Sequence, residues 1–417
     1  LPGCDGVKPT VSVVLTGYTF SWQEHGITIR ASQVKVHSSD GRVTGEITVE
    51  ATNEAGHPIV VYPSTTFNFT GPRSRIDLSK VLLAKYPKLP WGEMIDQLCF
   101  AVPERARQGE TTSELWTSAD IPDLEYLLKP ILIKGVPSMI FGEKAAGKST
   151  LALYIYTCLT LPWTDNPLGL EVPSRPVKTL LLDWELPGSI AQRNAKYLQQ
   201  GMGLPPFPLY HRRCRMPLAH DLEQVQRQID GVGAEAVIID SLARACGGDL
   251  NKTEPANAFF EALDQLKTTA LIIAQTSKDV ESKRKTPYGN ALFTYFARSI
   301  WELCKAETLG EDGIDLALFH RWSNLTKHFP AIGMRFNFNE HHTTVESQAV
   351  SVSDFAGKIS TQQAILSELK RGALSAKELA ERTGATENTV KVNLTRLKKK
   401  GRVSNPEEGM WGLTTFP

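Results

Sequence analysis

A glycine-rich segment carries the residues of this sequence best suited to chemistry on phosphates. In the stretch MIFGEKAAGKSTLALYIY, Gly142 is followed after four residues by Gly147, Lys148 and Ser149. Glycines let the backbone wrap around phosphate oxygens, the lysine can reach the β- and γ-phosphates, and the serine hydroxyl can ligate Mg²⁺. Apolar runs on both sides predict a strand before the loop and a helix after it. We therefore expect a phosphate-binding loop for ATP and Mg²⁺ rather than a turn that merely caps a helix.

The whole loop and the first residues of the following helix are expected to contact the nucleotide. Lys144 and Ala145 occupy positions where a proline and a third glycine often stand, so the sequence leaves the shape of the loop open. The expected nucleotide-binding residues are Gly142, Glu143, Lys144, Ala145, Ala146, Gly147, Lys148, Ser149 and Thr150.

Two carboxylates follow apolar strands and could serve the bound nucleotide. Asp240 ends the run AVIID, the usual place for the acid that holds Mg²⁺, so Ser149 and Asp240 are the expected metal ligands. The next residue is Ser241 and not glutamate, so the water-activating carboxylate must come from elsewhere. Glu185 in LLLDWELPG ends the strand after the expected loop and helix, where it would face the crevice that binds ligands in open α/β sheets. Alone it would be an ordinary polar strand end; after a phosphate-binding loop, the catalytic interpretation and a RecA-type arrangement are favoured.

A further strand ends beside a basic loop. Gln275 closes the run ALIIAQ, where an amide could sense the γ-phosphate and couple hydrolysis to the loop behind it. A basic loop with a Pro/Gly break suits a phosphodiester backbone, although a solvated charge run has the same composition. The basic residues expected to bind DNA there are Lys278, Lys283, Arg284 and Lys285.

The composition is that of an ordinary globular protein with more than one domain. The chain has 417 residues, 41% hydrophobic and 22% charged, with a formal net charge of +1, so nucleic-acid binding must come from local patches. Six cysteines are scattered without a C-x-x-C pair, which argues against a zinc site or a disulfide framework and favours a cytoplasmic setting. No apolar run approaches the roughly 18 residues of a membrane span, and the first 30 residues lack a signal-peptide pattern. Leu1 in place of Met leaves the native start open.

Patterning divides the chain into three expected domains. Residues 1–110 alternate in short β-type runs and then show two helical patterns, which predicts a β-rich domain with trailing helices. Residues 115–345 alternate buried strands with helices, which predicts an α/β domain with a mainly parallel sheet. Residues 354–417 form the third domain. The β-rich domain carries no interpretable motif; a collar, a partner-docking surface and an additional DNA grip would look alike.

The C-terminal segment predicts a winged helix-turn-helix. Three helical patterns and a hairpin follow each other, and the third helix would bury Val390, Leu394 and Leu397. Residues 354–405 hold eleven Lys and Arg against five Asp and Glu, a local charge of +6 that favours duplex DNA as the ligand. Glu407 and Glu408 at the wing tip would repel phosphate, so a protein-docking role stays open. The residues expected to face DNA are Asn388, Lys391, Thr395 and Lys398.

The order of these motifs resembles a known group of ATPases. GEKAAGKS, LLLDWELPG, AVIIDSLARACGGDLN, LIIAQTSK and HRWSNLTKHFPAIGMRF together resemble the RecA-like ATPases of the plasmid RepA type, which are hexameric replicative helicases, and related phage and mobile-element ATPases. The resemblance covers roughly residues 120–338. It implies ATP hydrolysis between subunits of a ring, with single-stranded DNA in the central channel.

The resemblance also implies roles for three arginines. Arg193 would be the arginine that follows the catalytic glutamate, and Arg298 in FARS would be offered to the neighbouring subunit's γ-phosphate, with Arg321 as a second candidate. Gln275 stands where many members have histidine, and Trp322 where lysine is common. The expected catalytic residues are Lys148, Glu185, Gln275, Arg298 and Arg321.

We therefore expect a RecA-like P-loop NTPase core between a small β-rich domain and a winged helix-turn-helix. The expected function is an ATP-dependent, ring-forming DNA helicase or translocase, a homo-oligomer expected to be a hexamer, acting in phage or mobile-element replication. Two alternatives remain at this stage. One is a recombination or repair ATPase that coats DNA without unwinding it, and the other is a DNA-binding regulator gated by nucleotide.

Overall fold

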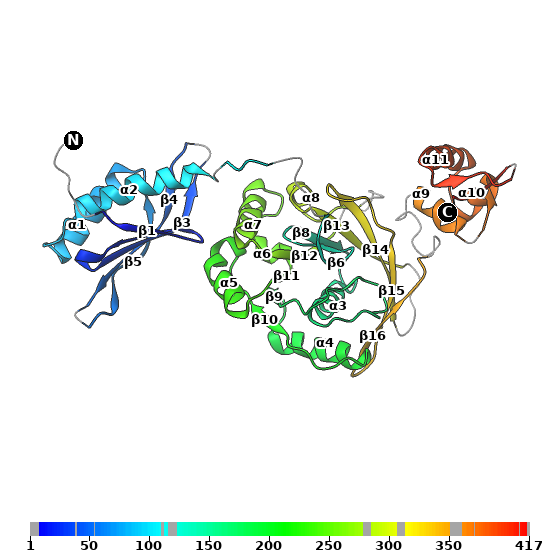
Figure 1. Cartoon of the computed structure of the whole chain (residues 1–417), viewed down its shortest axis with the longest axis horizontal. Helices are drawn as coiled ribbons and strands as arrows, with labels where there is room; N and C mark the ends of the chain where they lie inside the picture. The colour runs from blue at the N-terminus through cyan, green and yellow to red at the C-terminus, as the bar shows by residue number, and fades with distance from the viewer. Residues whose placement is uncertain are drawn as a thin grey trace. The chain divides into compact units, whose positions relative to one another are not determined.

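The chain divides into two compact units, each described here by itself. A computed structural model describes residues 8–37, 40–53, 55–109, 112–115, 123–277, 285–306, 313–350, 361–370, 372–407 and 409–414. The two units are Leu1–Ile121 and Pro122–Pro417. Figure 1 colours and labels their helices and strands along the chain.

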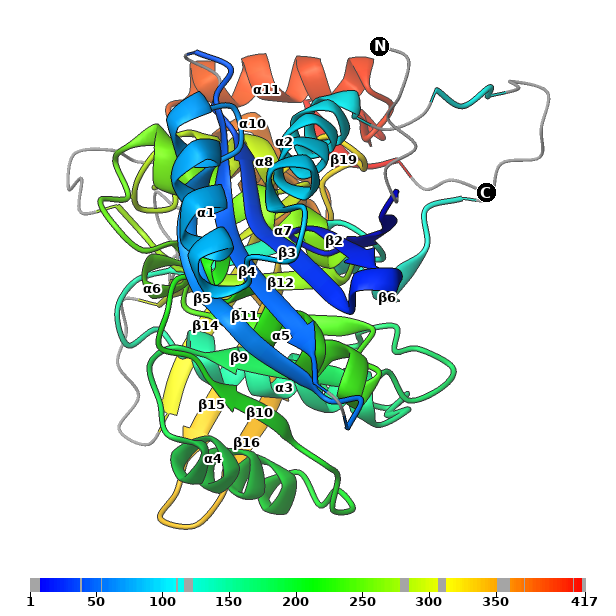
Figure 2. The same cartoon turned by 90° about the vertical axis from the view of Figure 1, so that its left-hand side faces the viewer.

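The first unit is an antiparallel sheet covered on one face by two helices, as Figure 2 shows. Buried and exposed residues alternate along the central strands, so one sheet face is apolar and packs against the helices. Trp22 and Trp91 lie in this core, and the Trp22 indole donates to the Gln97 side chain at 3.0 Å. Its elements, in chain order with the sheet ordered β1 to β5, are β1 (Thr10–Val14), β2 (Gly17–Trp22), η1 (Gln23–His25), β3 (Ile27–Val36), β4 (Val43–Thr52), β5 (Pro58–Asn68), α1 (Pro72–Lys85) and α2 (Trp91–Gln108).

The second unit is built on a nine-stranded sheet in the order β10-β9-β11-β12-β8-β13-β14-β15-β16, counted over the described residues. The strands from β10 to β13 in that order run parallel, and the remaining three continue the sheet antiparallel. The strands are β8 (Pro137–Gly142), β9 (Thr179–Asp183), β10 (Tyr210–Arg213), β11 (Ala236–Asp240), β12 (Thr269–Gln275), β13 (Ser299–Lys305), β14 (Gly313–Ser323), β15 (Ile332–Phe338) and β16 (Thr343–Ser347).

The parallel part confirms the prediction of a mainly parallel α/β sheet. Its inner strands are almost entirely buried, because helices cover both faces, and their near-continuous apolar runs reflect this burial. The antiparallel β14–β16 extension was not predicted, because its strands carry charged and polar residues that obscure the apolar pattern.

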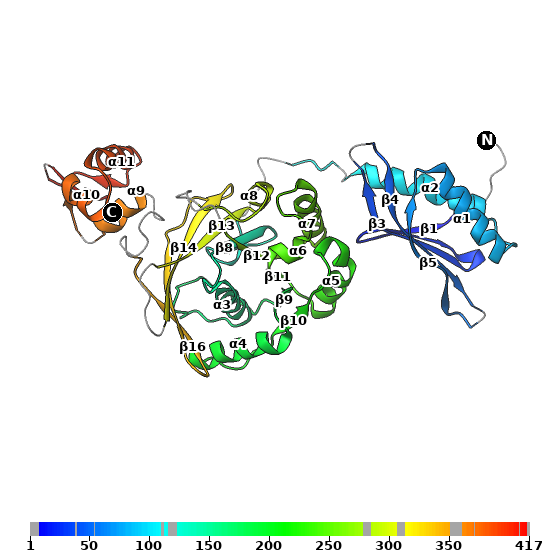
Figure 3. The same cartoon turned by 180° about the vertical axis from the view of Figure 1, so that it is seen from behind.

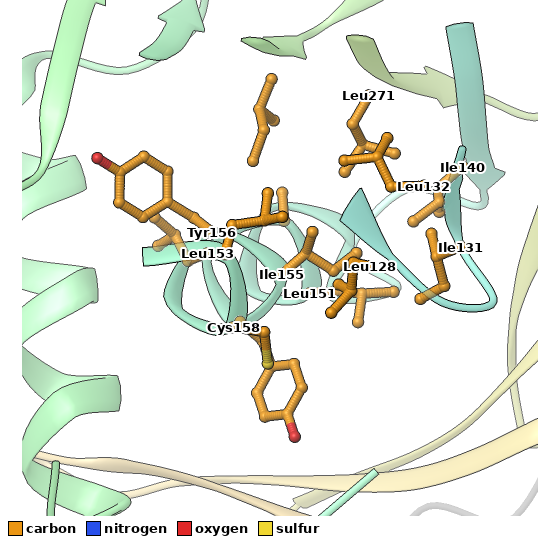
Figure 4. Close-up of a cluster of buried hydrophobic side chains, with 14 of the residues drawn as sticks. Leu128, Ile131, Leu132, Ile140, Leu151, Leu153, Ile155, Tyr156, Cys158 and Leu271 are labelled. Atoms are coloured by element: carbon orange, nitrogen blue, oxygen red, sulfur yellow. The ribbon is translucent and has the colours of Figure 1, made fainter. Parts of the chain in front are cut away.

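A buried helix forms the centre of this core. Residues 151–160 of α3 (Lys148–Thr160) are all buried, so the helix lacks a polar face. Figure 4 shows Leu151 and Ile155 of this helix among Leu271 of β12 and Ile140 of β8. The short hairpin β6 (Tyr126–Leu128) and β7 (Leu132–Ile133) adds Leu128 and Leu132 to the same cluster. The remaining helices of the α/β region are α4 (Gly188–Gly201), α5 (Leu218–Val232), α6 (Leu242–Cys246), α7 (Thr253–Leu266) and α8 (Leu292–Phe296).

The last helical turn of α4 lies against β16, as Figures 1 and 3 both show. A Cβ at Gly201 would lie 2.1 Å from the Thr343 carbonyl oxygen, so only glycine fits this approach. The antiparallel extension is thereby fixed to a helix of the parallel part.

The C-terminal residues form three helices and a small sheet around their own core. The helices are α9 (Thr361–Leu369), α10 (Ala376–Thr383) and α11 (Glu387–Lys399), and the strands are β17 (Leu374–Ser375), β18 (Val403–Ser404) and β19 (Met410–Leu413). Ser375 and Glu378 form a capping box at the start of α10, and Gly384 ends that helix with a positive φ of 66°. Val390, Leu394 and Leu397 are buried, as their helical spacing predicts.

His320 of β14 is held neutral inside the second unit. Its ring stacks on Trp301 with centroids 4.3 Å apart, and the Phe329 amide donates to its Nδ1 at 3.2 Å. Burial, reinforced by the nearby His328, lowers its pKa to about 4. The unfolded chain, with a histidine pKa near 6.5, therefore binds the proton at a higher pH than the folded chain does.

This difference predicts a loss of stability in acid. The stability that neutral His320 supports is present above pH 6.5 and falls as the pH drops toward 4, because only the unfolded state gains a proton there. Compared with a His320→Phe variant, the wild type is expected to lose about 2 kcal/mol of its free energy of unfolding between pH 7 and pH 5. Denaturant titrations of both proteins at the two pH values measure these free energies of unfolding. If the difference between the two proteins is the same at pH 7 and pH 5, the lowered pKa of His320 is contradicted.

Candidate nucleotide-binding and DNA-binding sites

The glycine-rich loop joins β8 to α3 at the carboxyl edge of the parallel strands. A Cβ at Gly142 would lie 2.5 Å from the Leu303 carbonyl oxygen, and one at Gly147 would lie 3.1 Å from the Phe336 ring. Ala145 has a φ of 59°, in the left-handed region that glycine usually occupies. The loop thus keeps its turn without the third glycine, at a cost on the order of 1 kcal/mol of backbone strain.

Lys148 points back into this loop. Its Nζ donates to the carbonyl oxygens of Gly142 at 3.0 Å and Glu143 at 2.6 Å. Burial lowers its pKa, while the charges of Asp240, Glu185 and Glu143 act in the opposite direction. An ammonium group held by carbonyl oxygens inside the loop can exchange these partners for phosphate oxygens, so the loop fits a nucleotide.

Ser149 and Asp240, the expected metal ligands, are hydrogen-bonded to each other. The Ser149 hydroxyl donates to Asp240 Oδ2 at 2.7 Å, and Asp240 ends β11 with only 8% of its surface exposed. Burial raises the Asp240 pKa to about 6, and the nearby carboxylates of Glu185 and Asp183 add to the rise. A group of carboxylates that repel each other around a serine hydroxyl fits a hard cation such as Mg²⁺.

Glu185 is held in position by two residues that sequence reasoning did not single out. Ser241 donates its hydroxyl to Glu185 Oε1 at 2.5 Å. Asp183, aligned with Asp240 on the neighbouring strand, accepts the backbone N–H groups of Glu185 and Leu186 at its Oδ1, each at 2.7 Å. Two features of the sequence could have pointed to them: Asp183 ends its apolar strand, and Ser241 directly follows Asp240. Glu185 itself stays exposed, so a water molecule can approach it.

Gln275 and Lys285 both lie beside the loop. Gln275 ends β12 in register with Gly142 on the adjacent strand, and it is exposed. Lys285 forms an ion pair with Glu143 of the loop, with its Nζ 2.6 Å from Oε1. The other basic residues of this segment, Lys278, Lys283 and Arg284, lie outside the described residues.

The candidate arginines have different surroundings. Arg321 forms an ion pair with Glu302, with its NH2 2.6 Å from Oε2, and its side chain is only 15% exposed. Arg298 is half-buried; its backbone N–H donates to the Pro137 carbonyl oxygen at the start of β8, at the sheet edge opposite the loop. Arg193 is exposed on α4 and lies over the Tyr197 ring. Arg321 is thus bound within its own chain, whereas Arg298 lies far from its own loop.

The residues expected to face DNA lie on the exposed side of α11. Asn388, Lys391, Thr395 and Lys398 are all exposed, opposite the buried stripe. Lys391 pairs with Glu387 one turn away at 2.6 Å, a surface pair weak enough to exchange for a phosphate. Lys398 instead donates to Asn405 in the wing and lies over the Trp411 ring, so it helps to fix the wing.

Comparisons with known proteins give matches for the two regions that carry these sites. Residues 103–281 match a family model described as an AAA domain, and residues 360–404 match one described as winged helix-turn-helix DNA-binding. No curated protein gives a significant match. Among solved structures, a KaiC-like protein from the hyperthermophilic archaeon Pyrococcus horikoshii OT3 is similar, with 15% identity, a TM-score of 0.35, and 52% of this chain and 93% of that chain covered.

The α/β part of the second unit thus has a RecA-like P-loop fold and is similar to AAA domains, and the C-terminal residues are similar to winged helix-turn-helix domains of the DNA-binding type. In the part of the chain that the structure describes, no helix is long and apolar enough to cross a membrane.

Proposed function

We propose that the protein is an ATP- and Mg²⁺-dependent DNA helicase or translocase that forms a ring of six subunits around single-stranded DNA. The observation that carries the proposal is the meeting of Lys148, the Ser149–Asp240 pair and Glu185 at one sheet edge. Bound Mg²⁺–ATP would supply the phosphoanhydride bond to be cleaved. Lys148 would bind the β- and γ-phosphates, Ser149 and Asp240 would hold the metal, and Glu185 would accept a proton from the attacking water.

Coupling to DNA would use elements next to this edge. Gln275 joins the strand beside the loop to the basic segment that ends at Lys285, and Lys285 contacts the loop through Glu143. A change in the loop on hydrolysis would therefore reach the basic segment directly. Replication of a phage, plasmid or integrated element is the setting that the sequence resemblance favours.

Strand displacement tests this proposal. The protein, ATP and Mg²⁺ are mixed with a forked duplex carrying a single-stranded tail, and release of the labelled strand is followed over time. Displacement that requires hydrolysable ATP is expected, and electron micrographs with an ATP analogue and oligo(dT) should show rings. ATP hydrolysis without strand displacement would favour an ATPase that coats DNA without unwinding it. Filaments in the micrographs would support the same alternative.

A nucleotide-gated DNA-binding regulator is the second candidate, because α11 presents an exposed polar face beside a winged-helix core. In that case duplex binding through the winged helix would be the main activity. Sequence-specific duplex binding that depends on bound nucleotide, without strand displacement, would favour this candidate.

We expect the winged helix to contribute measurably to the affinity for duplex DNA. Lys391→Ala is expected to weaken binding to duplex DNA and to reduce the slope of log affinity against log salt by about 0.9, the contribution of one phosphate contact. Lys80→Ala, which removes an exposed lysine from α1, is the matched control. Fluorescence anisotropy with a labelled duplex measures both. Identical slopes for the two variants would point to a protein-docking winged helix.

A further inference from the structure

A positively charged pocket lies next to the catalytic edge but outside the nucleotide site. It has a volume of about 420 Å³ and is formed by the residue that follows β9, the end of β10 with the segment after it, and helix α6. We call it the arginine pocket; its lining residues are Trp184, Arg213, Cys214, Arg215, Pro217 and Arg244.

Short-range contacts hold the walls of the arginine pocket in place. The Trp184 indole donates to the Met216 carbonyl oxygen at 2.8 Å, and the Cys214 amide donates to the Asp183 carbonyl oxygen at 2.8 Å. A Cβ at Gly247 would lie 2.5 Å from Pro217 Cγ, so the residue after α6 is pressed directly against the arginine-bearing segment. The pocket is therefore a built feature of the fold and not a gap between unrelated surface side chains.

The charge of the pocket is not neutralised from within the described part of the chain. There, no side chain or carbonyl forms an ion pair or hydrogen bond with the guanidinium of Arg215 or Arg244. Arg213 has one acidic neighbour, Asp183, with its NH1 3.4 Å from Oδ1. Guanidinium groups bind phosphate oxygens through paired N–H donors, so the pocket suits a phosphate-bearing ligand.

The pocket offers little to a nucleobase. Trp184 is the only aromatic residue in its lining and is just 3% exposed, so no ring face is open for stacking. The three arginines, in contrast, are exposed. A site that contacts phosphates and not bases binds DNA independently of its base sequence. A translocating enzyme requires this kind of binding.

One carboxylate oxygen connects the pocket to the candidate catalytic glutamate. Asp183 Oδ1 accepts hydrogen bonds from the backbone N–H groups of Glu185 and Leu186. The same oxygen is the partner of Arg213 NH1. A phosphate that draws Arg213 away from Asp183 would change the charge balance at the oxygen that positions the Glu185 backbone. Asp183 is thus a positioning residue placed between the two sites.

We propose that the arginine pocket binds the phosphodiester backbone of single-stranded DNA and that Asp183 transmits its occupancy to Glu185. This inference rests on the proposed function and adds the site and the route by which DNA would stimulate hydrolysis. Arg215 and Arg244 supply the phosphate contacts, and Arg213 divides its interactions between the DNA and Asp183.

The test compares the full-length wild type with the double variant Arg215→Ala/Arg244→Ala. Binding of fluorescein-labelled oligo(dT) is measured by anisotropy over a range of salt concentrations, and kcat and KM for ATP are measured with and without oligo(dT). The double variant is expected to lower the salt slope by about 1.4, from two lost contacts of about 0.7 each on a single strand. The DNA-dependent increase in kcat should fall, while KM for ATP stays close to that of the wild type.

Matched variants separate the pocket from general charge effects. Arg73→Ala/Arg227→Ala removes two exposed arginines elsewhere, 95% and 63% exposed, and should retain the wild-type slope and stimulation. Arg215→Lys/Arg244→Lys keeps the charge but loses the paired donors, so it should keep the slope and bind oligo(dT) more weakly. Thermal midpoints of all variants check that each is folded.

Each outcome decides between the proposals. If the wild type binds oligo(dT) and is stimulated by it, and the alanine double variant behaves identically, the pocket assignment is overturned while the proposed function stands. If the wild type neither binds oligo(dT) nor responds to it, both are overturned. If, with the nucleotide site saturated by an ATP analogue, inorganic triphosphate binds the wild type but not the double variant, and oligo(dT) binding is unaffected, the pocket holds a small polyphosphate and not DNA.

Discussion

Glu185→Gln is expected to bind ATP normally and to hydrolyse it at least about 10²-fold more slowly, because the change removes only the base that activates water. The glutamine keeps the length of the side chain and can still accept the hydrogen bond from Ser241. Its backbone remains held by Asp183. Measurements of kcat and of ATP affinity on the same preparation separate the loss of chemistry from a loss of binding.

Two further variants make the Glu185 prediction specific. Lys148→Ala should weaken nucleotide binding itself, since its ammonium occupies the phosphate loop. Ser241→Ala should lower kcat less than Glu185→Gln does, because the carboxylate survives and only its orientation is loosened. A normal rate of hydrolysis by Glu185→Gln would show that another group activates the water and that the RecA-type assignment of this residue is wrong.

Arg298→Ala is expected to bind ATP and assemble, yet to hydrolyse ATP about 10³–10⁵-fold more slowly, as losses of arginines that act on a neighbour's γ-phosphate do. Arg298 directly precedes Ser299, which aligns with Ser138, while Gly142 aligns with Leu303. At about 3.3 Å per residue, Arg298 lies about 16 Å along the strand from the loop of its own chain. Its guanidinium is therefore too far from the loop of its own chain to act there, and we expect it to act on a nucleotide in an adjacent subunit.

Mixing two inactive variants tests this directly. Arg298→Ala retains an intact loop and Lys148→Ala retains an intact Arg298, so a mixed ring contains some interfaces with both, and partial ATPase activity should return. Arg321→Ala is the comparison: because Arg321 is held by Glu302, its loss should affect stability more than trans-acting chemistry. Recovery with Arg321→Ala and not with Arg298→Ala would transfer the role to Arg321. No recovery with either would mean that each active site is complete within one subunit.

The sequence by itself determined the local parts of this protein. The phosphate loop, the strand that ends in Asp240, the two helices of the first unit and the three helices of the winged helix all follow from patterns within about 20 neighbouring residues. The strand expected to end in Glu185 is also present, but it ends two residues earlier, at Asp183. Such patterns reflect helix and strand periodicity, glycine conformations and helix capping, which depend on near neighbours in the chain. The winged-helix core illustrates this, since Val390, Leu394 and Leu397 are buried at the predicted spacing.

Tertiary structure decided how those parts work together. Ser241 holds Glu185 across 56 residues of sequence, and Ser149 reaches Asp240 across 91, so neither contact is visible in a local pattern. The same holds for the two arginines: the sequence offered both as candidates, and only the fold bound Arg321 to Glu302 and placed Arg298 at the opposite sheet edge. The physical reason is that strand order in a parallel sheet is set by packing between distant segments, and this order determines which strand ends meet.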